Sequence, residues 1–309
     1  MDYVMYKLNF SGGVHLGMGN LEDGEYVFCA DTFFSALFQE ALKRGEEIAE
    51  RFLNYCRDNR LLISDAFPYM GETYYLPKPM KRINASNHRG DSQLKKAYKK
   101  LKYIPVEEIG NYLRGTYDVK AAEDMNDLGD FQMKVSASVR GEEETKPYRV
   151  GSYYYREGNG LYIIVGYEEL DEFELMGELL DSLSFVGIGG KKASGMGKFK
   201  MCSANMPEEL KQRLKKPAEK YMTLSLSLPR EEEIEEALED AEYILCRRSG
   251  FVDSDHYAQM QRRKRDLYVL KSGACVSGKY RGDIYNVADG YGNHPVYRYA
   301  KPMFLGVDA

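Results

Sequence analysis

The chain has 309 residues, which is the length of about two domains of ordinary size. Charged residues make up 29% and apolar residues 43%, a globular composition that excludes disordered, collagen-like and coiled-coil chains. Basic residues number 43 against 48 acids, so the formal net charge of −5 argues against a nucleic-acid partner. No signal peptide precedes the first strand and no stretch approaches 18 apolar residues, so we expect a cytoplasmic protein without a membrane partner.

The charge is unevenly distributed along the chain. Residues 78–104 carry nine bases and one acid, and residues 243–281 carry nine bases and three acids, including Arg-Arg-Lys-Arg at 262–265. Residues 168–181 and 231–242 carry seven and eight acids, respectively, and no base. Because salt screens charges beyond roughly 10 Å, a locally basic surface can bind nucleic acid on an acidic protein.

The hydrophobic periodicity predicts an alternation of strands and helices in the first half. Residues 3–10 alternate as a strand, and a glycine-rich turn follows at 11–19. Apolar residues at helical spacing between Phe34 and Leu42 predict an amphipathic helix that Asp31 or Thr32 caps. The following predicted elements are a helix over 48–56, a strand at 61–63, extended proline-containing segments at 67–68 and 76–79, and a basic helix from Asp91 to about Tyr103.

Residues 131–156 alternate in two runs around a polar turn, which predicts a long hairpin that projects because it has little apolar surface to bury. A strand at 161–167, a helix at 171–183 and a strand from Phe199 follow. The order then restarts, with predicted strands at 221–228, 243–246, 266–270 and 303–307 and an acidic helix at 230–241. Both halves follow a β-α-β pattern, so we expect an α+β fold of two ferredoxin-like (RRM-like) domains, residues 1–210 and 211–309.

The most specific motif is the glycine-rich segment 187–199, GIGGKKASGMGKF. It is no Walker A loop, because Met196 follows Gly195 where a lysine is required, and no GxGxxG register fits. Its glycines allow close backbone approach to a phosphate, and its lysines supply positive charge that a purely structural loop does not need. We therefore expect phosphate-backbone binding by Gly189, Gly190, Lys191, Lys192, Ser194, Gly195 and Lys198.

His15 lies in the glycine-rich turn after the first strand. Its imidazole could take a 2′-hydroxyl proton as a general base in RNA cleavage, or it could form hydrogen bonds within a tight turn or with a phosphate. The five cysteines are scattered and form no C-x-x-C pair, and no two acidic residues have the spacing of metal ligands. The sequence therefore predicts no cofactor and no metal.

Five segments together resemble the RAMP proteins of CRISPR systems, and specifically the family of the fourth subunit of the Csm complex, the type III-A RNA-guided effector. They are VHLG at 14–17, ADTFFSAL at 30–37, LPKP at 76–79, the glycine-rich segment 187–199 and HPVYRY at 294–299. The resemblance runs in order from residue 3 to about residue 307, and so covers nearly the whole chain.

This resemblance implies two ferredoxin-like domains, with 131–156 as a projecting thumb hairpin and 187–199 as the glycine-rich RAMP loop. It implies a subunit without enzymatic activity, in antiviral defence, that binds the single-stranded 5′ repeat-derived tag of crRNA and no DNA by itself. It also implies docking to the large polymerase-like subunit and to the backbone RAMP subunit.

On this reading the thumb contacts RNA through Arg140, Lys146, Arg149 and Tyr154, with Tyr153 and Tyr155 as further stacking candidates. Arg247 and Arg248, in the second basic stretch, are expected RNA contacts as well. The basic stretches 78–104 and 262–265 and the acidic helix have no assigned partner. The alternative function is a metal-independent endoribonuclease that matures crRNA with His15 as its base.

Overall fold

The structure is a computed structural model that describes residues 1–17, 19–82, 92–119, 125–138, 146–254 and 256–308. It combines helices with antiparallel sheets, as the sequence predicts for an α+β chain. Asp91 and Arg140, which the sequence analysis names, lie outside the described residues. Within the described ranges, no helix has both the length and the apolar character needed to cross a bilayer.

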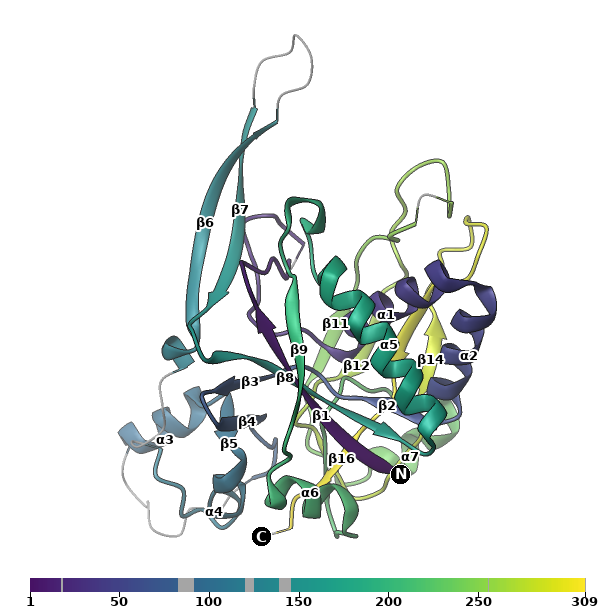
Figure 1. The fold of residues 1–309 in the computed structure, drawn as a ribbon. Helices are drawn as coiled ribbons and strands as arrows, with labels where there is room; N and C mark the ends of the chain where they lie inside the picture. The colour runs from purple at the N-terminus through teal and green to yellow at the C-terminus, as the bar shows by residue number, and fades with distance from the viewer. Residues whose placement is uncertain (18, 83–91, 120–124, 139–145, 255, 309) are drawn as a thin grey trace.

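A seven-stranded antiparallel sheet forms the centre of the N-terminal half (Figure 1). Its strand order is β5-β4-β3-β8-β1-β9, and β2 also pairs with β8. The predicted strands at 3–10, 61–63 and 161–167 are confirmed, and β9 begins at Phe199 as expected. The strands are β1 (Asp2–Phe10), β2 (Leu61–Ile63), β3 (Phe67–Met70), β4 (Thr73–Pro77), β5 (Tyr103–Pro105), β8 (Asn159–Tyr167) and β9 (Phe199–Ala204).

Helices α1 (Ala30–Arg44), α2 (Glu46–Arg57) and α5 (Leu170–Val186) pack against one face of this sheet. On α1, Phe34 and Leu37 are fully buried at helical spacing, which is the pattern that predicted the helix. The predicted cap is wrong, because Cys29 occupies the N-cap position and makes no side-chain cap bond. The carboxylate of Asp31 is instead engaged by arginines from the C-terminal half.

The opposite face of the sheet packs against the C-terminal half. Successive residues of a strand point to opposite faces, so Ile163 of β8 joins the helical core while Tyr162 and Ile164 join a second core with Leu224 and Leu305. Three helices contribute to this second core or border it. They are α3 (Ser92–Lys100), α4 (Ile109–Leu113) and α6 (Glu208–Lys215), and α4 follows a 3-10 turn η1 (Val106–Glu108). The two halves of the chain therefore share one apolar core.

The C-terminal half consists of short strands in three small sheets, ordered β13-β10-β16, β11-β12 and β14-β15. The predicted helix at 230–241 is wrong in extent, because only a 3-10 turn η4 (Glu231–Glu233) and a single turn α7 (Ile234–Leu238) form. Ala237 is the one buried residue of α7, so packing contributes little against the repulsion of adjacent acids. The strands are β10 (Tyr221–Thr223), β11 (Leu245–Arg248), β12 (Leu267–Leu270), β13 (Cys275–Val276), β14 (Asp283–Asn286), β15 (Tyr297–Ala300) and β16 (Phe304–Gly306).

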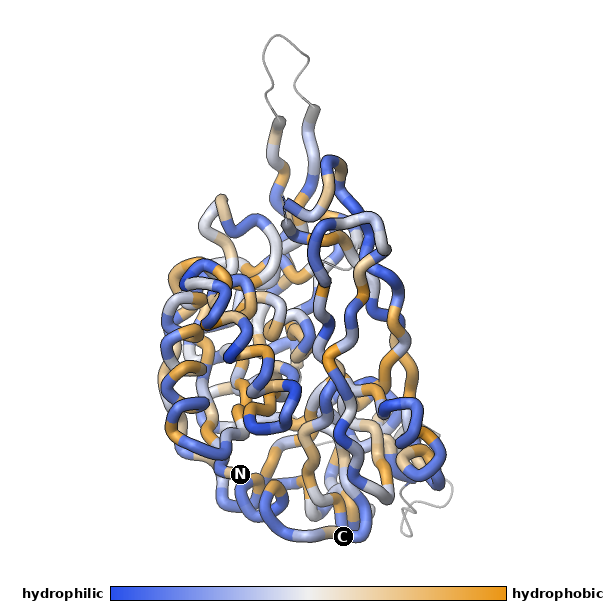
Figure 2. Tube along the Cα trace, turned by 90° about the vertical axis from the view of Figure 1, so that its right-hand side faces the viewer, coloured by the Kyte–Doolittle hydropathy of each residue, from blue (hydrophilic) through white to orange (hydrophobic). Residues whose placement is uncertain are grey.

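A long β-hairpin projects from the N-terminal half, which contains the seven-stranded sheet (Figure 1). Its strands β6 (Gly129–Ser138) and β7 (Lys146–Tyr155) pair antiparallel, with Gly129 opposite Tyr155 and Ser138 opposite Lys146, and a 3-10 turn η2 (Met125–Asp127) precedes β6. In two views at right angles the described part of the hairpin reaches beyond the rest of the chain (Figures 1 and 2). Phe131, Met133 and Val135 remain exposed along β6, so the described part of the chain leaves this apolar face of the hairpin largely uncovered.

Candidate nucleic-acid interface

Three segments that are far apart in sequence meet at the base of the hairpin. They are the glycine-rich turn at 13–17, strand β7 and the glycine-rich loop 187–199, and we call this contact region the junction. Val14 exchanges two backbone hydrogen bonds with Tyr153 of β7, at 2.9 and 2.8 Å. The backbone N–H of Gly190 donates to the carbonyl oxygen of His15 at 2.8 Å. The residues after β1 therefore connect the hairpin to the loop.

The loop 187–199 needs its glycines for its backbone conformation. Gly187, Gly189, Gly195 and Gly197 all have positive φ, between 75° and 92°, in a region where an L-residue is strained. Gly197 closes the loop, because its carbonyl oxygen accepts from the N–H of Ile188 and its own N–H donates to Gly13, both at 3.0 Å. Lys191 also adopts a left-handed conformation, with φ of 59°.

His15 is buried within the junction, with only 5% of its surface exposed. Its Nδ1 lies 2.7 Å from the carbonyl oxygen of Gly151, so Nδ1 carries the proton and donates to β7. A Cβ atom on Gly190 would lie 2.6 Å from the imidazole Cδ2, which shows how closely the loop packs on this ring. Of the roles considered for His15, the structure shows a hydrogen-bonding one, and the bond joins the glycine-rich turn to strand β7.

The lysines of the loop are presented at the surface of the junction. The Nζ of Lys191 lies 4.7 Å from the centre of the Tyr148 ring on β7. Lys192 is half-buried, and Ser194 and Lys198 are exposed. None of the ion pairs among the described residues involves these lysines. Their charges are therefore not neutralised by an acid of the described chain, and they suit an anionic ligand.

The three consecutive tyrosines of β7 have different surroundings. Tyr153 is 8% exposed and packs on Tyr26, with ring centres 5.5 Å apart. Tyr155 stacks on Phe10 at 5.1 Å and its hydroxyl donates to the carbonyl oxygen of Tyr26. These two rings are occupied by protein contacts and are poor platforms for a base. Tyr154 points to the other face of the strand, next to Gly13, where a Cβ atom would lie 2.7 Å from its ring.

The remaining basic residues named from the sequence lie in different places. Arg149 is exposed on β7, opposite Val135. Arg247 is exposed on β11, with its guanidinium 3.7 Å from the carboxylate of Asp266. The structure therefore places Arg149 on the hairpin that carries the junction, and Arg247 on a separate strand of the C-terminal half.

Arg248 has an internal role that the sequence analysis did not foresee. Its Nε and Nη2 donate to the two carboxylate oxygens of Asp31 at 2.9 and 2.8 Å, and Arg298 donates to the same carboxylate at 2.5 Å. Burial alone would raise the pKa of Asp31, but the two guanidiniums hold that pKa below its usual value. The guanidinium of Arg248 already binds a carboxylate that is 2% exposed, so it is poorly placed to contact RNA.

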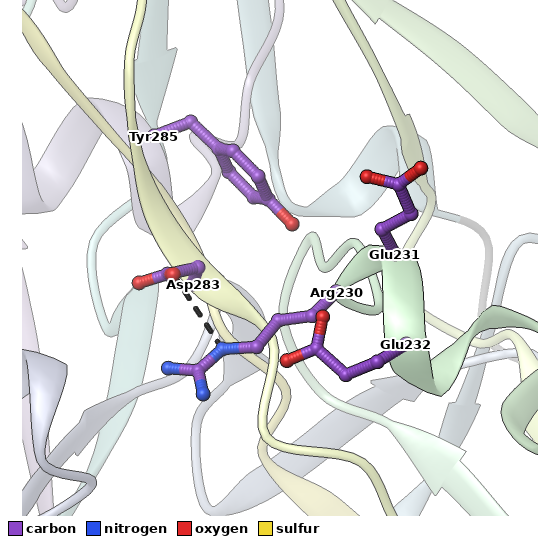
Figure 3. Close-up of a pocket in the computed structure, with 5 residues that line it drawn as sticks. All are labelled: Arg230, Glu231, Glu232, Asp283 and Tyr285. Carbon is purple, nitrogen blue, oxygen red and sulfur yellow. Dashed lines mark ion pairs between the residues drawn. The ribbon is translucent and has the colours of Figure 1, made fainter.

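A polar pocket in the C-terminal half has the wrong charge for a phosphate (Figure 3). It encloses about 420 Å³ and is lined by Arg230, Glu231, Glu232, Asp283 and Tyr285. Arg230 is paired with Asp283 at 3.5 Å, which leaves two glutamates in excess. Among the described residues, no cluster of His, Cys, Asp and Glu has the arrangement needed to hold a metal ion.

A larger groove, which the sequence analysis missed, lies between the base of the hairpin and α3. It encloses about 800 Å³, and aromatic rings and basic side chains line it, among them Tyr26, Tyr103 and Lys102. The residues that line the groove come from six separate stretches of the chain, between Tyr26 and Arg156, so no local pattern could have identified them together. In the sequence, the basic stretch 78–104 was the one feature that pointed to this region.

Comparison with known proteins identifies the family. Residues 216–307 match a family model described as the CRISPR Csm4 C-terminal domain. The chain is 36% identical over 309 residues to "CRISPR system Cms protein Csm4" of Mycobacterium tuberculosis, and the match covers 99% of this chain and 98% of that protein. The chain belongs to the Csm4 family.

Other relatives and solved structures agree with membership of the Csm4 family. A Streptococcus thermophilus protein of the same name is 32% identical over 324 residues, and both chains are covered completely. The fold is similar to a chain in a crystal structure of a Csm3-Csm4 subcomplex of the type III-A interference complex, with a TM-score of 0.68, 16% identity and coverage of 99% and 100%. It is also similar to a chain in a Csm1-Csm4 cassette with pppApA, with a TM-score of 0.63, 20% identity and coverage of 99% and 98%. The resemblance noted from the sequence motifs is thus confirmed.

Proposed function

We propose that this Csm4-family chain is a non-catalytic subunit of a type III-A Csm effector complex and holds the single-stranded 5′ tag of crRNA at the junction. The observation that carries the proposal is the set of lysines on the loop 187–199 that form no ion pair with any described acid. Backbone hydrogen bonds join this loop to the turn at 13–15, which is in turn bonded to β7. Phosphates bind to such lysines and exposed backbone N–H groups, while a ring such as that of Tyr154 can stack on a base. Gly189, Gly190, Ser194, Gly195 and Lys198 belong to the same proposed track. We propose Arg149 as an RNA contact on the other face of β7, the face to which Tyr153 also projects.

We further propose that the hairpin acts as a thumb and that the chain divides near residue 210 into two ferredoxin-like domains. In the N-terminal half the strand order β9-β1-β8-β2, with helices after β1 and β8, is the order of a ferredoxin-like unit. In the C-terminal half β10 is flanked by β16 and β13, and β11 pairs with β12. The described residues between β12 and β16 contain no second helix, so this half would be an abbreviated version of the unit.

The protein partners follow from the family. The proteins in the similar structures were solved as a Csm3-Csm4 subcomplex and a Csm1-Csm4 cassette. We propose that this chain likewise docks a backbone RAMP subunit and the large polymerase-like subunit. Co-purification of both with the full chain would support this assembly role, and a chain that captures neither would contradict it.

The junction is tested by replacing Lys191 and Lys192 together with alanine. Each phosphate contact that is lost from a single strand lowers the slope of log affinity against log salt by about 0.7, so the slope should fall by about 1.4. The matched control is Lys211→Ala with Lys216→Ala, which removes the same charge from exposed positions on α6 and at its C-cap. Tag-bearing RNA whose affinity and slope are unchanged in the Lys191 and Lys192 variant would overturn the assignment.

The endoribonuclease alternative is tested at His15. An imidazole that is 5% exposed, with Nδ1 bound to a backbone carbonyl, is poorly placed to reach a 2′-hydroxyl group. We expect the purified chain to leave repeat RNA intact in the presence of EDTA. Cleavage by the chain that disappears in His15→Ala would show that the chain is an enzyme.

A further inference from the structure

The groove between the hairpin base and α3 combines rings and positive charge. Tyr26, Tyr103 and Phe131 all line it, and Phe131 is 46% exposed. Lys100 and Lys102 are exposed on the same rim, and the Nζ of Lys102 lies 5.8 Å from the centre of the Tyr26 ring. Its volume of about 800 Å³ lies in the range of about 300–1,000 Å³ that holds a small organic ligand. A nucleobase with its sugar is a ligand of that size.

The groove and the junction lie on opposite faces of the hairpin. Phe131 and Tyr153 are partners in the hairpin register, so both project to one face, and both line the groove. The glycine-rich loop contacts the other face, where Ser152 donates to the Sδ of Met196 and Lys191 lies over Tyr148. Because side chains alternate along a strand, the groove is a second surface and not an extension of the first.

The charge balance of the groove favours an anion. Among the described residues that line it, Lys100, Lys102 and Arg156 stand against one carboxylate, that of Asp130. Arg156 is paired with Asp130 at 3.5 Å and with Asp127, outside the lining, at 2.7 Å, so its charge is offset within this group. Burial raises the pKa of Tyr26 to about 12, with a smaller contribution from Glu25, so the phenol stays neutral at physiological pH. Lys100 and Lys102 therefore leave the rim positive.

We infer that this groove binds a single-stranded segment of RNA. A base stacks on the exposed ring of Phe131, while Lys100 and Lys102 contact the adjoining phosphates, as is typical of single-strand binding. The inference rests on the proposed function in taking RNA as the ligand, and it gives a role to the basic stretch 78–104. A flexible protein segment from another subunit is the alternative occupant, but the two lysines beside the exposed ring of Phe131 favour RNA.

The test compares two double variants of the full chain in binding to single-stranded RNA across a range of salt concentrations. Lys100→Ala with Lys102→Ala removes the two rim charges, and the salt slope should fall by about 1.4. Lys96→Ala with Lys99→Ala is the matched control, because these lysines are exposed on α3, the helix that ends at Lys100, but do not line the groove. An equal change in both variants, or no change in the first, overturns the inference.

A third variant tests stacking independently of charge. Phe131→Leu keeps an apolar side chain against Gly24 but removes the ring, and the loss of one stacked base should weaken binding by about 5- to 150-fold with the salt slope unchanged. Unchanged affinity for this variant contradicts base stacking on Phe131. Thermal unfolding of each variant shows that the fold is retained.

The outcomes separate this inference from the proposed function. If the Lys191 and Lys192 variant loses affinity while the Lys100 and Lys102 variant does not, the groove assignment fails and the junction stands. If the reverse holds, the junction assignment fails. If the Lys100 and Lys102 variant binds RNA normally but no longer captures a partner subunit, the occupant is a protein and the RNA assignment is wrong.

Discussion

Replacing Gly197 with alanine tests whether the glycine-rich loop is held in one conformation that presents its lysines. Gly197 has a φ of +75°, and a Cβ atom there would overlap the carbonyl oxygen of Ile188. The same residue makes the two backbone hydrogen bonds that close the loop, to Ile188 and to Gly13. Because the overlap is with backbone atoms, a rotamer change cannot relieve it. The loop has to open, and both hydrogen bonds are then lost.

The expected loss of stability follows from these contacts. Left-handed strain costs an L-residue about 1–2 kcal/mol and each lost hydrogen bond about 1 kcal/mol, which gives about 3–4 kcal/mol in all. An unfolding entropy of about 2.1 cal/mol/K per residue corresponds to about 0.65 kcal/mol/K for 309 residues. The Tm should therefore fall by about 5 °C. Gly195 is the matched control, because its φ is +81° but a Cβ atom there meets open space, so Gly195→Ala should lower Tm by only about 2 °C.

Thermal unfolding followed by circular dichroism measures these shifts, and a titration with single-stranded RNA measures the functional consequence. Gly197→Ala should lose RNA affinity because Lys191 and Lys192 are displaced, whereas Gly195→Ala should retain most of it. Equal Tm shifts in the two variants, together with unchanged RNA affinity for Gly197→Ala, would refute the claim that the closed loop forms the binding surface.

Buried acids between the two halves give two further predictions. Asp31→Ala leaves the guanidinium of Arg298, which is 7% exposed, without its carboxylate partner, and should lower the free energy of unfolding by about 3–5 kcal/mol. The control removes the exposed carboxylate of Glu178, which pairs with Arg44, and should lower it by less than about 1 kcal/mol. Equal losses in the two variants would contradict the structural role of the Asp31 ion pair. For Asp65, burial raises the pKa to about 6 against the opposing hydrogen bonds from Ala30 and Leu226. The folded chain then binds a proton between about pH 4 and pH 6 that the unfolded chain has released, so stability falls as pH rises through this window. Asp65→Asn should flatten that dependence in urea unfolding, and an unchanged slope would show that Asp65 is not its source.

Local sequence patterns were sufficient to predict the helices and strands whose apolar residues recur at regular spacing. The strand at 3–10, the helix containing Phe34 and Leu37 and the strand at 61–63 all follow from spacing, because each places apolar residues at regular intervals in the helical core. The acidic helix at 230–241 failed for the converse reason. Its one buried residue, Ala237, provides too little packing for a helix of that length to form.

Local sequence patterns could not predict contacts between segments that are far apart in the chain. Asp31 looked like a helix cap, but its carboxylate binds Arg248 and Arg298, more than 200 residues away in the chain. The glycine-rich loop was recognised from composition, but its closure on Gly13 depends on tertiary structure. The same holds for the aromatic groove, whose members share no periodicity.

The most direct test of the account is to map where RNA contacts the chain. A crRNA that carries 4-thiouridine in its 5′ tag is bound to the full chain, irradiated and digested, and the crosslinked peptides are identified. The account predicts crosslinks to the loop 187–199 and to strand β7 near Tyr154. Crosslinks confined to the acidic segment 231–242 and the pocket at Arg230, with none at the junction, would contradict it.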